Sequence, residues 1–263
     1  MPQSQRHTTR LTLLQKIIRY ALVALTLFCI YAVLIEFLFQ QKKSKQTVTT
    51  EYWSHRGRNN AGLPENSIAA FEHALQHGLK GIEVDVFWDE ATKQILVTHD
   101  TPQSSQQYPL LKEIVSRFKD SISYWIDFKN LTNENVKEVE EAVAQLAATY
   151  HLKGKLYLES AHGTVLRKIN SPNIRTLYWV QYGRHFPKRP FKLLYIKSLI
   201  VFSKFYGYTS SYSLMDDDFR KQFGGLPLYI FHANAQQLKK EETIPSSVKV
   251  QLADEDYLKL LKP

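Results

Sequence analysis

The sequence predicts an α/β fold, namely a (β/α)8 TIM-type barrel preceded by one N-terminal transmembrane helix. Three observations lead to this prediction. Strand-like runs alternate with amphipathic runs from Glu51 onward, which favours a parallel sheet. The strand-like runs number about eight, which favours closure into a barrel over a doubly wound open sheet, the second choice. One long apolar run precedes all of them.

The strand-like runs are short and rich in β-branched and aromatic residues. They comprise residues 52–54, 81–87, 95–98, 124–128, 155–159, 176–180, 227–231 and 249–252. Only the seven residues 88–94 separate the second run from the third. A crossover helix needs about ten residues or more, so this pair forms either a hairpin or an irregular corner of the barrel.

Helical patterns lie between most of these runs, at residues 67–77, 133–150, 216–223 and 255–261. The first places Ile68, Phe71 and Leu75 on one face and stops at Gly78, a residue type that often ends helices. The third begins with three aspartates, which favour a helix N-terminus because they complement the helix dipole. The fourth is a short closing helix.

The apolar run at residues 20–39 reads YALVALTLFCIYAVLIEFLF. It is just long enough to cross ~30 Å of hydrocarbon as a helix, with Glu36 near one interface. Four cations precede the run and three follow it, which favours an N-terminus on the inside. We expect an uncleaved anchor. The alternative, a cleavable signal peptide, has a shorter apolar region that ends in a small-x-small site, and this run has neither feature.

The predicted organisation is a cytoplasmic basic N-terminus (1–19), a transmembrane anchor (20–39), a linker (40–50) and a barrel domain (51–263) on the extracytoplasmic side. The net charge of +9 suits anionic surfaces. Its cations are spread along the chain, so we expect no nucleic-acid partner. The only cysteine, Cys29, lies in the apolar run, which excludes an intrachain disulfide and a thiolate metal cluster. The oligomeric state stays open.

Pairs of charged or imidazole side chains stand in or just after four strand-like runs. These pairs are His55-Arg56, Glu83 and Asp85, His99-Asp100, and Asp127 and Lys129. Residues i and i+2 of a strand share one face about 6.5–7 Å apart, so Glu83 and Asp85 suit a divalent cation that prefers oxygen ligands. Both faces of a barrel strand are buried, and buried carboxylates need a partner or a metal. In a barrel these pairs converge on the mouth, where active sites form.

Such a set contains what phosphodiester hydrolysis needs. A hard cation held by carboxylates neutralises phosphate charge. Arginine and lysine stabilise the charge that develops on the oxygens. Two histidines supply a base for the attacking hydroxyl and an acid for the leaving oxygen.

From Ser54 to Asp100 the chain resembles the glycerophosphodiester phosphodiesterases. The shared motifs are His55-Arg56-Gly57, Pro64-Glu65-Asn66-Ser67, Ala70-Phe71, Glu83-Val84-Asp85-Val86 and His99-Asp100. Later stretches are similar to further strands of the family, and these are residues 126–129, 158–160 and 228–234. The resemblance implies a barrel of the phospholipase-C-like phosphodiesterase type, with calcium or magnesium as cofactor and glycerophosphodiesters as substrates.

The resemblance also implies a role for each residue of the motifs. His55 and His99 are the acid–base pair; Glu83, Asp85 and Asp127 are metal ligands; Arg56 and Lys129 contact phosphate; Glu65 and Asn66 support the site.

Three departures from the family pattern bear on the substrate. Asp127 is one methylene shorter than the family's glutamate. Only 26 residues separate Asp100 from Asp127, so the usual substrate-shaping insertion is missing or much reduced. Phe231 and His232 stand where the family has Trp-Thr. The pattern therefore keeps the chemistry and alters the substrate pocket.

Alternatives to glycerophosphodiester hydrolysis stay open. One is a lipid phosphodiesterase that acts on lysophospholipids, similar to a lysophospholipase D or a sphingomyelinase. Another is a non-catalytic anchored binding protein. The basic, aromatic segment 182–208 has two interpretations: a helix packed on the barrel with a cationic outer face, or an element on the membrane surface.

Overall fold

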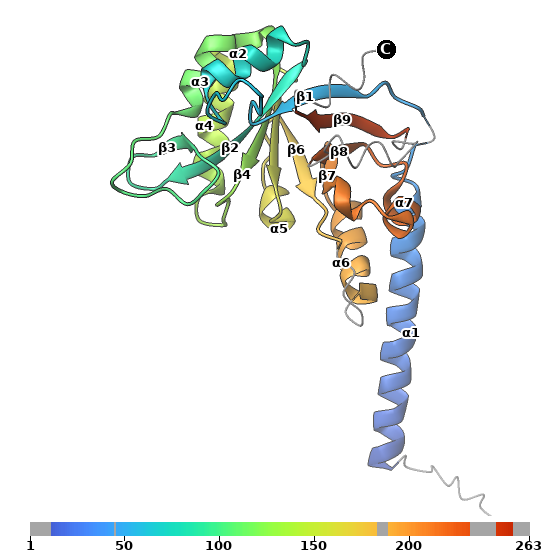
Figure 1. The fold of residues 1–263 in the computed structure, drawn as a ribbon. Coiled ribbons are helices and arrows are strands. Elements are labelled where there is room, and N and C mark those ends of the chain that lie inside the picture. The colour runs from blue at the N-terminus through green and yellow to red at the C-terminus, as the bar shows by residue number, and fades with distance from the viewer. Residues whose placement is uncertain (1–11, 45, 183–188, 232–245, 255–263) are drawn as a thin grey trace, which may run out of the picture.

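The computed structural model describes residues 12–44, 46–182, 189–231 and 246–254. Eight parallel strands form a closed barrel (Figure 1). In the order of their pairing they are β1 (Glu51–His55), β2 (Gly81–Asp89), β4 (Ser123–Phe128), β5 (Leu156–Ser160), β6 (Ile174–Trp179), β7 (Gly207–Ser211), β8 (Leu228–Phe231) and β9 (Val248–Ala253). The pairing of β1 with both β2 and β9 closes the sheet. The predicted TIM-type barrel is confirmed, and the open sheet is excluded.

The set of barrel strands differs from the predicted one at two places. Strand β3 (Gln94–Val97) pairs antiparallel with β2, so residues 88–94 form a hairpin and β3 lies outside the barrel. Strand β7 completes the set of eight barrel strands, and it was not predicted. Its sequence, Gly-Tyr-Thr-Ser-Ser, has little apolar character, and the helical segment before it masks the boundary.

Large side chains fill the interior of the barrel. They form one buried cluster made of Trp53, Trp125, Tyr157, Leu177, Tyr229, Phe231, Val250 and Leu252. Gly81 makes room for one of them, because a Cβ at this position would lie 2.6 Å from the Trp53 ring. This packing supplies a rigid floor beneath the carboxyl ends of the strands.

Helices follow most of the barrel strands. They are α2 (Ile68–Gln76), α3 (Leu111–Phe118), α4 (Val136–Thr149), α5 (Gly163–Leu166), α6 (Arg189–Val201) and α7 (Asp217–Phe223), with short 3-10 turns at Lys119–Ser121 and Tyr212–Leu214. Ser67 caps α2 by accepting a hydrogen bond from the Ala70 N–H, and Asp216 caps α7 in the same way. The predicted helices at 67–77, 133–150 and 216–223 are confirmed. The predicted helix at 255–261 lies outside the described residues.

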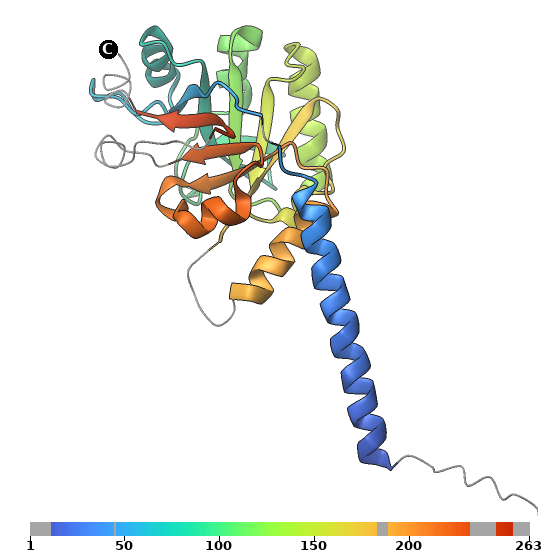
Figure 2. The same cartoon turned by 90° about the vertical axis from the view of Figure 1, so that its right-hand side faces the viewer.

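Helix α1 (Leu13–Gln40) extends away from the barrel (Figures 1 and 2). It is long and apolar enough to cross a membrane, a property that membrane spans share with signal sequences. Its last two turns are packed on the barrel domain. Ile35 and Phe39 are fully buried, and the Phe39 ring meets Phe223 of α7 at 6.1 Å.

Hydrogen bonds hold the predicted linker, residues 40–50, to the barrel domain, and one of them runs from the Lys43 ammonium to the Lys221 carbonyl at 3.3 Å. The Ser44 N–H donates to the Gly225 carbonyl at 2.8 Å, and the Val48 N–H donates to the Ser246 carbonyl at 3.0 Å. The Thr50 hydroxyl donates to the Val248 carbonyl at 2.9 Å. The end of α1 therefore leads into the barrel along a fixed path.

Helix α6 lies beside the second half of α1 (Figure 2). Phe28 meets Phe191 at 6.3 Å, and the Tyr31 hydroxyl donates to Ser198 Oγ at 2.8 Å. The expected cationic outer face is wrong for one of its lysines. Lys197 is buried, 2.6 Å from Glu36 Oε2 and 2.8 Å from Gln222 Oε1. Arg184 and Lys188 of the same segment lie outside the described residues.

Candidate active site

A tight turn after β1 carries the first motif. Strand β1 ends at His55, and Arg56 and Gly57 follow with φ of 56° and 73°. A Cβ at Gly57 would lie 2.6 Å from the Cβ of Ala70, so only glycine allows α2 to approach this closely. The turn places His55 and Arg56 at the carboxyl end of the barrel, beside β2.

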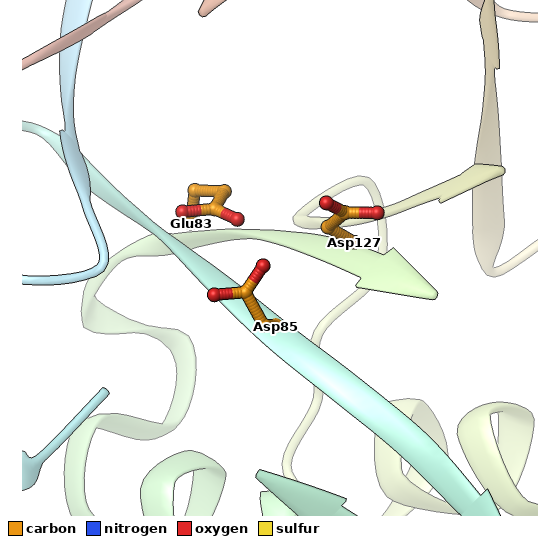
Figure 3. Close-up of side chains that lie close together, drawn as sticks. All are labelled: Glu83, Asp85 and Asp127. Carbon is orange, nitrogen blue, oxygen red and sulfur yellow. The ribbon is translucent and has the colours of Figure 1, made fainter. Parts of the chain in front are cut away.

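Three carboxylates lie together at this end of the barrel (Figure 3). Glu83 and Asp85 point the same way from β2 because they are two residues apart. Asp127 of β4 stands directly opposite Asp85 in the strand register. Oxygen atoms of the three groups lie within 4.8 Å of one another, and Glu83 and Asp85 are buried.

Two cations compensate this negative charge in part. Arg56 Nε lies 2.9 Å from Asp85 Oδ2, and Lys129 Nζ lies 2.7 Å from Asp85 Oδ1. Lys129 also donates to Asp127. Asp85 is therefore the carboxylate that both cations share.

The two predicted supporting residues hold this arrangement from α2's side. Asn66 donates to Asp85 Oδ2 at 3.0 Å and accepts from the Asp85 N–H at 3.2 Å, which fixes the carboxylate. Glu65 is more exposed and lies 3.7 Å from the Arg56 guanidinium. Neither residue lies among the three clustered carboxylates.

The two histidines of the motifs line one cavity of about 110 Å³. His55 is buried, with Nδ1 3.9 Å from Asp254 Oδ1. His99 follows β3, and its side chain is 48% exposed, with Nδ1 2.8 Å from Asp100 Oδ1. Arg56, Glu83, Asp127 and Lys129 line the same cavity. Strand β3 lies outside the barrel, but its pairing with β2 places His99 at the mouth.

The same stretch of chain carries the similarity to known proteins. Residues 55–100 match the model of the glycerophosphoryl diester phosphodiesterase family. A glycerophosphodiester phosphodiesterase of Bacillus altitudinis is 33% identical over 119 residues. Over this stretch the chain is similar to the glycerophosphodiester phosphodiesterases. The match to the Bacillus relative covers 41% of this chain and 47% of that relative, so it spans about half of the relative's length.

Solved structures of the family share the fold. A glycerophosphodiester phosphodiesterase of Parabacteroides distasonis has a TM-score of 0.62 at 19% identity, covering 82% of this chain and 98% of that one. One from Thermotoga maritima has a TM-score of 0.61 at 15% identity, covering 83% and 100%. A phosphodiesterase of Oleispira antarctica, solved with the product sn-glycerol-3-phosphate, has a TM-score of 0.57 at 17% identity, covering 80% and 95%.

The departures from the family pattern have visible structural results. The shorter Asp127 still brings its carboxylate into the cluster. The reduced segment after Asp100 contains one short helix, α3, before β4. Phe231 lines the cavity together with Trp179 and Leu252, so one part of its wall is apolar. His232 lies outside the described residues.

Some residues at the cavity were not predicted from the sequence. The most important of these is Glu159, which adds a carboxylate to the site. Glu159 of β5 stands opposite Asp127 in the register, is buried, and lines the cavity. It accepts hydrogen bonds from Trp125 Nε1 at 2.5 Å and from the Thr209 hydroxyl. A carboxylate in the apolar strand 155–159 was the available signal. Trp179, Leu252 and Asp254 gave none, because they meet the site only through closure of the barrel.

Burial shapes the electrostatics of the cluster. It raises the pKa of Glu83 well above its usual range, and the neighbouring Asp85 and Asp127 carboxylates add to the shift. Burial raises the pKa of Asp127 as well, against the opposing effect of Lys129. Burial lowers the pKa of Lys129, but Asp127 and Asp85 outweigh it and the net shift is upward. The site thus holds more negative charge than its own cations balance.

Glu159 makes the stability of the protein depend on pH. Burial raises its pKa from the ordinary 4.5 to about 8, with Asp127 contributing. The folded state then binds the proton more tightly than the unfolded chain, so stability falls as pH rises from about 4.5 to about 8. Glu159→Gln removes this loss. We expect the variant to gain on the order of 2–4 kcal/mol over wild type across that window, and nothing further above it.

Urea denaturation from pH 4 to pH 9, in the presence of a chelator, measures this difference. Glu141→Gln, an exposed carboxylate on α4, is the matched control and should follow wild type. Parallel stability curves for wild type and Glu159→Gln would show that Glu159 is not held protonated in the folded state.

Proposed function

We propose that the protein is a membrane-anchored, metal-dependent phosphodiesterase that hydrolyses glycerophosphodiesters to glycerol phosphate and an alcohol. The observation that carries this proposal is the single cavity at the barrel mouth. Two imidazoles, three carboxylates, a guanidinium and an ammonium line it together. The match of residues 55–100 to the family model supports the reaction class, and the glycerol-3-phosphate product in the Oleispira structure supports the substrate class.

Calcium or magnesium fits the carboxylate cluster. The donors are oxygens, which both ions prefer, and they lie within 4.8 Å of one another. Three carboxylates face only two cations, Arg56 and Lys129, and the raised pKa of Glu83 reflects that deficit. Glu83, Asp85 and Asp127 would hold the ion. When bound, such an ion neutralises phosphate charge and makes the phosphorus more electrophilic.

The residues of the chain supply positioning and proton transfer. Arg56 and Lys129 hold phosphate oxygens and stabilise the charge that develops on them. One histidine of the pair His55 and His99 takes the proton of the attacking hydroxyl, and the other protonates the leaving oxygen. Asp254 and Asp100 lie beside these imidazoles, 3.9 Å from His55 Nδ1 and 2.8 Å from His99 Nδ1. Asn66 keeps the Asp85 carboxylate in place.

A lipid phosphodiesterase that takes lysophospholipids is the second candidate. One observation favours it: the cavity wall formed by Trp179, Phe231 and Leu252 is apolar and offers a surface for an acyl chain. The cavity itself, at about 110 Å³, accommodates a phosphate with a small attached group. Both candidates use the same polar residues. They differ in the group attached to the phosphate, which is glycerol in a glycerophosphodiester and an acylated glycerol in a lysophospholipid.

Membrane attachment is part of the proposal. The anchor is α1, the N-terminus lies inside, and the barrel lies on the extracytoplasmic side. Helix α6 lies beside α1, and exposed aromatic side chains on and just after it support contact with lipid, namely Phe191, Tyr195 and Phe202. Carbonate extraction of membranes distinguishes the anchor from a cleaved leader: an anchored chain stays in the pellet at its full mass.

A substrate panel tests the reaction. Full-length protein in detergent is given glycerophosphocholine, glycerophosphoethanolamine, lysophosphatidylcholine and sphingomyelin, each with calcium, magnesium, manganese or a chelator. We expect turnover of at least one glycerophosphodiester that the chelator abolishes and added metal restores. Faster turnover of a lysolipid would favour the second candidate. The absence of turnover with every substrate and metal would contradict the enzyme proposal.

A further inference from the structure

A second, larger cavity lies at the opposite end of the barrel from the candidate active site. It has a volume of about 720 Å³ and opens where β6, β7 and β8 begin. Its polar lining includes Lys42, Ser171, Arg175, Ser203, Lys204 and Tyr206. No acidic side chain is among the described residues that line it. The cavity is therefore a concave, cationic surface that the proposed reaction does not use.

The three cations of this cavity have no carboxylate partner in the described part of the chain. Arg56, Lys129 and Lys197 form ion pairs, whereas Lys42, Arg175 and Lys204 form none among the described residues. Like charges gathered in a hollow raise the local potential and attract an anion. The charge of the cavity therefore favours the binding of an anion.

Arg175 is held in a fixed position by aromatic rings. Its guanidinium lies 4.3 Å from the centre of the Tyr206 ring and 5.1 Å from that of Tyr157, whose hydroxyl accepts one of its N–H groups. A guanidinium has five N–H donors in a rigid fork that matches phosphate, and the stacking restricts its motion beforehand. Little side-chain freedom would be lost on binding a phosphate here.

Ser203 adds a buried hydroxyl to the wall of the cavity. The residue is 5% exposed, and its Oγ has no hydrogen-bond partner among the described residues. Buried hydroxyls are nearly always paired with protein or with a bound group. Because this Oγ has almost no accessible surface, a phosphate oxygen in the cavity would accept its proton only after the Ser203 side chain rotates toward it.

The position of the cavity identifies the source of the phosphate. Lys42 lies two residues beyond the end of α1, and Phe202, beside Ser203, is 59% exposed. If α1 spans the membrane as proposed above, Lys42 stands at headgroup level, and the exposed Phe202 suits contact with the acyl boundary. We propose that this cavity binds the phosphate of an anionic phospholipid headgroup, which seats the barrel on the membrane surface.

Lipid titrations of the full-length protein test this site. The protein in neutral detergent micelles is titrated with short-chain phosphatidic acid, short-chain phosphatidylcholine or inorganic phosphate, and the thermal midpoint is followed. We expect phosphatidic acid to raise the midpoint most. Lys42→Gln with Lys204→Gln should weaken its apparent affinity about 10- to 30-fold, since each cation near an anionic surface contributes about 1 kcal/mol, or about fivefold. Arg175→Lys, which keeps the charge but loses the fork, should also weaken it.

Control variants separate a site from general charge. Lys112→Gln with Lys137→Gln removes two exposed cations elsewhere and should leave the affinity within threefold of wild type. Turnover of a soluble glycerophosphodiester should be unchanged in both double variants, so failure here leaves the proposed reaction untouched. Equal losses in the two double variants, or no midpoint shift in wild type, would overturn the proposal. An equal shift with inorganic phosphate would identify a free anion as the ligand instead of a lipid.

Discussion

Replacing His99 with alanine is expected to lower kcat for a glycerophosphodiester by about 10²- to 10⁴-fold, the usual contribution of a general acid or base. The side chain is half-exposed at the lip of the cavity, and its described contact is with the exposed Asp100. Its loss should therefore leave the fold and the binding of substrate nearly unchanged. Steady-state kinetics and calorimetric binding on the full-length protein measure the two effects separately.

The matched control is His151→Asn, an exposed histidine at a positive φ that asparagine tolerates. It should keep wild-type kinetics. A kcat for His99→Ala within threefold of wild type would remove His99 from the chemistry. Binding of substrate by the wild type without any turnover, at every metal tried, would instead support the non-catalytic binding protein.

Replacing Glu83 with glutamine is expected to abolish stabilisation by metal while preserving the fold without metal. Glutamine keeps an oxygen that can accept from the Arg56 N–H, a contact of 3.1 Å in wild type, and it brings no charge into a buried position. Because burial raises the pKa of Glu83, the neutral variant should be at least as stable as wild type in a chelator.

For wild type, an ion at a hundred times its dissociation constant adds about 2.7 kcal/mol, or roughly 5–10 °C in Tm for a protein of this size. Glu83→Gln should lose most of that rise and nearly all metal-dependent turnover. Glu141→Gln on the exposed face of α4 should keep both. Thermal melts with and without calcium or magnesium decide the matter. An equal rise in wild type and Glu83→Gln would mean that the ion binds elsewhere.

The predicted part of the site was carried by residues close together in sequence. His55, Arg56, Glu83 and Asp85 lie in or next to two paired strands, so the i, i+2 rule and the strand ends were enough to bring them together. His99 reaches the mouth through the β2–β3 hairpin, one of the two alternatives allowed by the seven-residue connection.

The features that were missed depend on contacts between distant segments. Glu159 and Trp179 face the site because β5 pairs with β4 and β6 pairs with β5, a strand order that no local pattern shows. Lys197 belongs to the segment for which a cationic outer face was one of two interpretations, and neither carried information about α1 packing against this helix. β7 lacks the apolar pattern of its neighbours because Gly207 makes room for the Tyr229 ring inside the barrel, where a Cβ would lie 2.5 Å from it.

The burial of Ile35 and Phe39 against the barrel makes the end of α1 part of the domain's own cooperative folding unit. Glu36 and Lys197 add a charged pair to that contact. Under a pulling force or in denaturant, the barrel and the last turns of this helix should then give way together. A proteolytic cut at residue 45 would not release an intact soluble barrel, because it would strip away two core side chains and leave the apolar surface around Phe223 open to aggregation.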